Sequence, residues 1–77
     1  MTKVELLPKW YGKEERVARS KALKAVATEL IATGKMTAKE EEFLKEEAMN
    51  FMIIGDTFSR NYVIKQVNQL IDFSKCR

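Results

Sequence analysis

The chain has 77 residues, of which 45% are hydrophobic and 32% are charged, and its formal net charge is +3. This length suits one small domain, and this composition is typical of a folded chain rather than a disordered one. The chain has no histidine and one cysteine, Cys76, so it cannot by itself supply a histidine base, an internal disulfide, or a zinc or iron–sulfur site. Because there is no disulfide framework, no long apolar run and no signal-peptide pattern, we expect a cytoplasmic protein without a membrane segment.

The sign of the charge alternates along the chain. Residues 1–37 carry eight Lys or Arg and four Glu, residues 38–56 carry two Lys and six acidic residues, and residues 57–77 carry four Lys or Arg and one Asp. An antiparallel bundle would place the acidic middle segment against its two basic neighbours. Exposed ion pairs contribute little to stability, so the pattern bears on which helices pair and not on how stable they are.

Hydrophobic periodicity predicts an all-α fold, a small three-helix bundle. An irregular N-terminal arm is expected at 1–12 and a three-helix domain at 13–77, with helices at approximately 13–33, 38–54 and 57–74. Gly34 suits the end of the first helix. Thr37 and Glu40 fit a capping box at the start of the second, and Asp56 or Thr57 is expected to cap the third.

Each helix carries an apolar stripe at helical spacing that is expected to form the core. The stripe of the first helix is Leu23, Val26, Ala27 and Leu30; that of the second is Phe43, Leu44, Ala48, Phe51 and Ile54; that of the third is Val63, Ile64, Val67, Leu70 and Ile71.

The densest apolar run, 48–54, is expected to form the C-terminal half of the second helix. Met49, Met52 and Ile53 fall outside the stripe, so this end of the helix is apolar nearly all round. A helix that is apolar on every side must be covered on every side. The neighbouring helices alone are too few for this, so we expect the arm, a second copy of the chain or another protein to cover the rest.

The third helix presents aromatic residues on the side opposite its stripe. Aromatic rings interspersed with amides and a cation are typical of protein-contact surfaces. The other interpretation is that the arm or a neighbouring copy of the chain lies across them. With the two methionines, the predicted protein-binding residues are Met49, Met52, Phe58, Tyr62, Lys65, Gln66, Gln69 and Phe73.

Cations near the arm and the first helix form an alternative site for nucleic acid or for a small phosphorylated ligand. Its candidate residues are Lys9, Trp10, Tyr11, Lys13, Arg16, Lys21 and Lys24. The structural interpretation is that Trp10 packs back on the bundle as an anchor and that the cations form an ordinary solvated face.

Residues 38–74 also have the outline of a helix-turn-helix, which places polar side chains of its second helix in the DNA major groove. The base-reading types there are Arg60, Asn61, Lys65, Gln66, Asn68 and Gln69. The glutamate-rich start of the second helix counts against this mode, because those side chains would lie near phosphates.

No glycine-rich phosphate-binding motif is present, and the glutamates at 40–42, 46 and 47 are best explained as a solvated helix start. We therefore expect a non-enzymatic protein, without cofactor or metal ion, that binds and modulates another protein. A homodimer is the alternative form of that contact. Analogy of size and class alone suggests a regulator or inhibitor of the kind encoded by phages and mobile elements.

Overall fold

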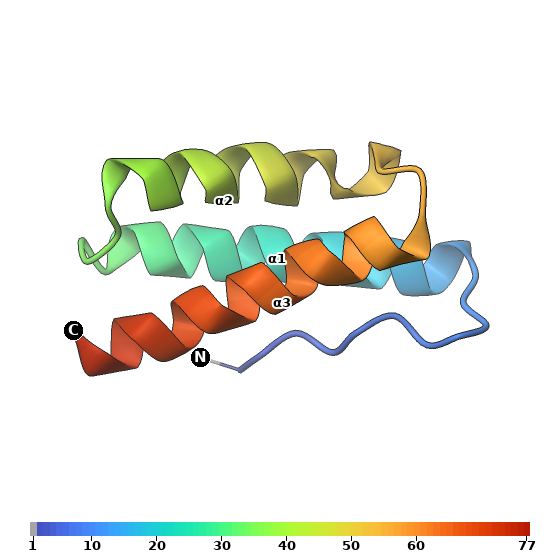
Figure 1. Ribbon diagram of the computed structural model, residues 1–77, viewed down its shortest axis with the longest axis horizontal. Helices are drawn as coiled ribbons and strands as arrows, with labels where there is room; N and C mark the ends of the chain where they lie inside the picture. Colours follow the sequence, from blue (N-terminus) through green and yellow to red (C-terminus); the bar gives the residue numbers. More distant parts are fainter. Residues whose placement is uncertain (1) are drawn as a thin grey trace.

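Three antiparallel helices and an extended arm make up the fold (Figure 1). The computed structural model describes residues 2–77, in which α1 is Lys13–Ala32, α2 is Ala38–Asn50 and α3 is Thr57–Cys76. A short 3₁₀ helix, η1 (Phe51–Ile53), follows α2, and no strand occurs in the described residues. The helices lie lengthwise in a molecule that measures 36 × 20 × 17 Å. The predicted all-α, three-helix fold with a non-helical N-terminal segment is confirmed.

Local signals end and start the helices as expected. Gly34 has a φ of 70°, a left-handed conformation that glycine adopts without strain, and it follows the end of α1. The hydroxyl of Thr37 accepts a hydrogen bond from the Glu40 amide at 3.2 Å, and the Glu40 carboxylate accepts one from the Thr37 amide at 2.9 Å. Asp56 caps α3 by accepting a hydrogen bond from the Ser59 amide at 3.1 Å.

The core lies between the three helices and consists largely of the predicted stripes. Every member of the α1 stripe and of the α3 stripe is buried. From the second segment, Leu44, Ala48 and Phe51 are buried, whereas Phe43 and Ile54 are only half-buried against the core. The α1 and α3 stripes are therefore confirmed, and the α2 stripe is narrower than predicted.

The apolar run at 48–54 does not continue as an α-helix to its end. α2 stops at Asn50, and the tighter winding of η1 changes the directions in which the following side chains point. Phe51 is fully buried, but Met49 is 63% exposed and Ile53 is 80% exposed. The predicted helix end at 54 is therefore wrong, and neither the neighbouring helices nor the arm cover this run on all sides.

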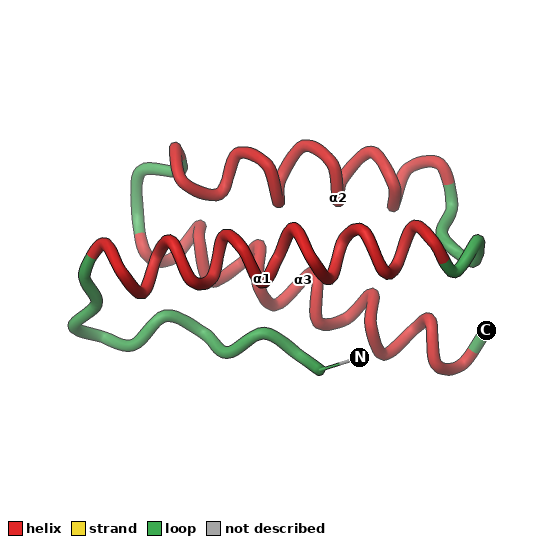
Figure 2. Tube along the Cα trace, turned by 180° about the vertical axis from the view of Figure 1, so that it is seen from behind, coloured by secondary structure: helices red, strands yellow, loops and turns green. Residues whose placement is uncertain are grey.

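The arm is extended and runs alongside α1 and α3 (Figures 1 and 2). Its Val4 and Leu7 side chains are buried. The Asn68 side chain accepts a hydrogen bond from the Val4 amide at 2.8 Å and donates one to the Val4 carbonyl at 2.9 Å. Asn61 accepts from the Leu7 amide at 2.8 Å. Because Asn61 and Asn68 are two turns apart on α3, they present their amides to the arm on one face.

Side chains of α1 and α3 also hold the arm from its two sides. Arg19 of α1 donates to the carbonyl of Glu5 at 3.1 Å and to the carbonyl of Leu6 at 3.2 Å. Lys3 pairs with Asp72 of α3 at 2.9 Å. The arm thus packs on the bundle, as expected from the sequence, and it does so through Val4 and Leu7.

Tyr11, and not Trp10, anchors the end of the arm that leads into α1. Trp10 is 87% exposed, so the expectation that it packs back on the bundle is wrong. The hydroxyl oxygen of Tyr11 accepts hydrogen bonds from Arg60 at 2.6 Å and from Thr57 at 3.0 Å, and these bonds, the one from Thr57 most, lower the pKa of Tyr11. The buried Arg60 needs an acceptor, which a phenol offers and an indole, a donor only, does not.

Candidate protein-binding face

A cluster of exposed aromatic side chains lies along the side of the molecule where α2 and α3 meet. Phe58, Tyr62 and Phe73 come from one side of α3 and are 79%, 53% and 48% exposed. The arm binds the other side of α3, through Asn61 and Asn68. The interpretation that the arm lies across these aromatic rings is therefore wrong, and the rings face solvent.

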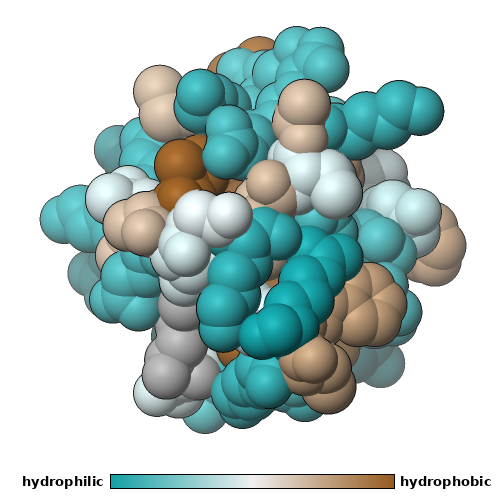
Figure 3. Space-filling view, turned by 90° about the vertical axis from the view of Figure 1, so that its left-hand side faces the viewer, coloured by the Kyte–Doolittle hydropathy of each residue, from teal (hydrophilic) through white to brown (hydrophobic). Residues whose placement is uncertain are grey.

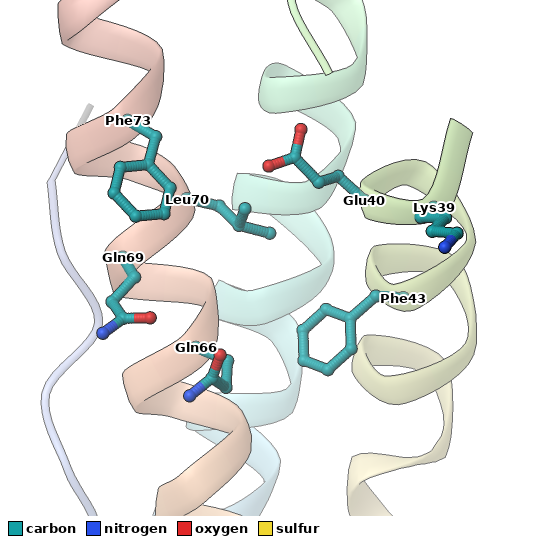
Figure 4. Close-up of a pocket in the computed structure, with 7 residues that line it drawn as sticks. All are labelled: Lys39, Glu40, Phe43, Gln66, Gln69, Leu70 and Phe73. Atoms are coloured by element: carbon teal, nitrogen blue, oxygen red, sulfur yellow. The ribbon is translucent and has the colours of Figure 1, made fainter. Parts of the chain in front are cut away.

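A hollow of about 200 Å³ lies at one end of this cluster, between the start of α2 and the end of α3. The rings of Phe43 and Phe73 stand on its opposite sides, and the amides of Gln66 and Gln69 lie along its α3 edge (Figure 4). Leu70 forms part of the floor. The charged residues Lys39 and Glu40 complete the lining. The hollow therefore combines two aromatic walls and two uncharged amides with a pair of opposite charges from the start of α2.

Glu40, which lines this hollow, is paired with Arg77. The two carboxylate oxygens of Glu40 accept hydrogen bonds from Arg77 at 2.7 and 2.9 Å, and Arg77 also donates to the carbonyl of Lys35 at 3.0 Å. The bonds from Arg77, followed by that from the Thr37 amide, lower the pKa of Glu40 to about 2. This bidentate pair joins the last turn of α3 to the first turn of α2, at the largely hydrophilic end of the molecule that Figure 3 shows.

Replacing Glu40 with Gln is expected to lower the free energy of unfolding by about 1 kcal/mol near neutral pH, because it removes a bidentate ion pair and weakens the α2 cap. The pKa of Glu40 falls from 4.5 to about 2 on folding. The stabilisation is therefore fully present above about pH 4.5 and is lost as the pH falls towards 2. Urea unfolding of the wild type and of Glu40→Gln at several pH values between about 2 and 7 measures this stabilisation. The exposed Glu42→Gln is the control, and an equal loss for Glu40→Gln at every pH would contradict the assignment.

A second hollow, of about 340 Å³, lies at the other end of the aromatic cluster. Its lining residues are Glu47, Ile54, Phe58, Ser59, Tyr62 and Val63. Glu47 is the only charged side chain among them. We use the name α2–α3 face for the residues that line the two hollows: Lys39, Glu40, Phe43, Glu47, Ile54, Phe58, Ser59, Tyr62, Val63, Gln66, Gln69, Leu70 and Phe73.

The structure brings five of the eight predicted protein-binding residues together on this face, all from α3: Phe58, Tyr62, Gln66, Gln69 and Phe73. Lys65 is exposed on α3 outside the two hollows. Met49 lies on the opposite side of α2, and Met52 is half-buried against the core.

The α2 side of the face was missed by sequence reasoning, which assigned Phe43 and Ile54 to the core. Both residues lie at the margin of the α2 stripe, so their angular offset from Leu44 on a helical wheel is the signal that could have found them.

The alternative basic site is brought together only in part, because Lys13, Lys21 and Lys24 lie along α1 and the other candidates lie elsewhere or are engaged inside the protein. Lys13 and Lys21 line a shallow hollow on α1, and Lys24 lines a groove between α1 and α2. Arg16 is half-buried near the start of α1. The Lys9 ammonium lies 5.8 Å from the centre of the exposed Trp10 ring.

Tyr11 is committed elsewhere, because its hydroxyl binds Arg60 and Thr57. Of the six base-reading types of the helix-turn-helix alternative, Arg60 is buried, and Asn61 and Asn68 bind the arm. These three side chains are therefore used inside the protein.

Comparison with protein-family models, curated proteins and solved structures finds no match for this chain. Within residues 2–77, the helices are too short or too polar to span a bilayer. The same residues include no group of three His, Cys, Asp or Glu side chains that could hold a metal ion.

Proposed function

We propose that this protein is a small non-enzymatic regulator or inhibitor that binds another protein through the α2–α3 face. The observation that carries the proposal is the exposure of Phe58, Tyr62 and Phe73 on one side of α3, with the arm bound to the other side. Fully burying an exposed apolar side chain contributes about 1.5–3 kcal/mol, and a side chain that is already half-buried gains roughly half of this. A partner that covers all three thus gains binding free energy that the single chain leaves unused.

The chemistry of the face suits a protein partner. Its aromatic rings supply rigid contact area, and the amides of Gln66 and Gln69 can hydrogen-bond to a partner's backbone. Glu40 is neutralised by Arg77 at one end, and Glu47 stands at the other. The uncharged centre with charges at its ends resembles the core and rim of protein interfaces.

A homodimer through the same face is the alternative form of this proposal. Nucleic acid fits the face less well, because Glu47 lines it and Glu46 is exposed on the same helix. Phosphate neutralisation supplies most of the non-specific affinity of proteins for nucleic acid, and these carboxylates oppose it.

The test compares the double variant Tyr62→Ala/Phe73→Ala with the wild type and with Trp10→Ala, a control that removes a more exposed aromatic side chain elsewhere. Circular dichroism first checks that all three proteins fold. Each immobilised protein then captures partners from cells of its source, and the affinity of any captured protein is measured. We expect the double variant to bind about tenfold or more weakly and Trp10→Ala to bind like the wild type.

Light scattering on the pure proteins separates the two forms of the proposal. A dimer that the double variant weakens, and Trp10→Ala does not, would identify a second copy as the partner. The proposal is wrong if the wild type is monomeric and the double variant retains the same proteins with the same affinity.

A further inference from the structure

A second groove lies on the opposite side of α2, between α1 and α2. Its volume is about 320 Å³, and its lining residues are Lys24, Ala27, Thr28, Ile31, Leu44, Lys45, Ala48 and Met49. Ala27, Leu44 and Ala48 form a buried floor, and the two alanines leave space there because their side chains are small. Lys24 from α1 and Lys45 from α2 provide a cation from each helix.

The basic character continues along α1 towards its N-terminus. Lys13, Val17 and Lys21 are spaced four residues apart, and Lys24 follows on the next turn, so these side chains lie along one side of the helix. Lys13, Val17 and Lys21 line a shallow hollow on α1 together with Ala18 and a single acidic residue, Glu14. We call the two hollows together the α1–α2 groove.

The four lysines of the α1–α2 groove, Lys13, Lys21, Lys24 and Lys45, make no ion pair with the described part of the chain. By contrast, Arg19 on the other side of α1 is paired with Glu15 and lies 3.9 Å from Glu5. The lysine charges of the groove are therefore free to act on a partner.

We infer that the α1–α2 groove is a second protein-binding surface and that its partner is an acidic amphipathic α-helix. Apolar side chains three and four residues apart on such a helix would enter the floor at Ala27 and Ala48, and flanking Asp or Glu residues would meet Lys24 and Lys45. A helix in this groove packs against α1 and α2 together, as a further helix does in a bundle. The inference does not depend on the α2–α3 face, because the two surfaces lie on opposite sides of α2.

The composition of the groove favours this occupant over nucleic acid and over a membrane. No aromatic side chain lines it, so it lacks the stacking platforms on which single-stranded bases bind. Membrane-surface helices insert apolar side chains that project outward, whereas Ala27, Leu44 and Ala48 are buried and, of the apolar side chains that line this groove between α1 and α2, only Met49 is largely exposed. A recessed apolar floor with cations along its edges fits an apolar ridge flanked by carboxylates.

The probe is a synthetic helical peptide of about 18 residues, long enough to form helix when capped, with Leu along one face and Glu on both flanks. It is titrated into isotope-labelled full-length protein and followed by the backbone amide signals. We expect shifts at Thr28, Ile31 and Met49 and no shifts at Tyr62 or Phe73. A peptide with Lys in place of each Glu is the charge control and is expected not to bind.

Two protein variants of equal charge complete the test. Lys24→Glu/Lys45→Glu reverses the charge at the two lysine positions beside the apolar floor of the groove. Lys65→Glu/Lys75→Glu makes the same change of net charge at exposed positions of α3. We expect the first to weaken peptide binding about tenfold or more and the second to weaken it far less. The inference is overturned if the acidic peptide does not bind, if both variants weaken it equally, or if the shifts map to the α2–α3 face. Tighter binding of a DNA oligonucleotide at the same amides would also overturn it.

Discussion

Replacing Phe51 with Ala is expected to lower the free energy of unfolding by about 3–5 kcal/mol, the usual cost of removing a fully buried phenyl ring from a core. Phe51 is 0% exposed and is the largest fully buried side chain of the described residues. It lies in η1, which contacts both α1 and α2. Domains of this size have a total stability of roughly 4–11 kcal/mol, so this single change removes a large share of it.

Urea denaturation followed by circular dichroism measures the effect. The control is Ile53→Ala in the same turn of 3₁₀ helix, where the side chain is 80% exposed. We expect this control to change the free energy of unfolding by less than about 0.5 kcal/mol. If the two variants lose equal stability, the assignment of Phe51 to the core and of Ile53 to the surface is wrong.

Replacing Leu7 with Ala is expected to cost about 2–3 kcal/mol, because Leu7 is 5% exposed in the arm alongside α1 and α3. The value lies at the lower end of the usual range because an arm can adjust more than a helix can. The matched control is Leu6→Ala, since the neighbouring Leu6 is 42% exposed. Equal effects of the two substitutions would contradict the packing of the arm.

A double-mutant cycle with Asn68→Ala tests whether the arm binds as one unit. Asn68 exchanges two hydrogen bonds with the backbone of Val4, and its removal leaves both backbone groups without this partner. If the arm detaches as a whole, Leu7→Ala costs less in the Asn68→Ala background than in the wild type. Simple additivity of the two losses would indicate that the two ends of the arm bind independently.

The position of α2 between the two proposed binding surfaces makes them separable by experiment. Phe43 and Glu47 point to the α3 side, whereas Lys45 and Met49 point to the α1 side. Substitutions in one proposed binding surface therefore leave the residues of the other surface unchanged.

Local sequence by itself determined the helices, most of their ends and most of the core. The capping box at Thr37, the cap at Asp56 and the left-handed Gly34 depend on residues within one turn of each other. The stripes of α1 and α3 likewise follow from helical spacing alone. The end of α2 was misjudged, because apolar residues continue through η1 and periodicity does not distinguish 3₁₀ from α winding over so few residues.

Only the tertiary structure decided where the arm lies and which surfaces remain free. The hydrogen bonds that the Val4 and Leu7 amides donate to Asn68 and Asn61 join residues 64 and 54 positions apart. No local pattern encodes such pairs, so Asn61 and Asn68 looked like surface residues available to a ligand. The arm binds these asparagines on one side of α3 and leaves Phe58, Tyr62 and Phe73 on the other side in solvent. The physical reason is that an extended segment forms no regular hydrogen bonds of its own, and its place is set by the partners it meets once the helices have packed.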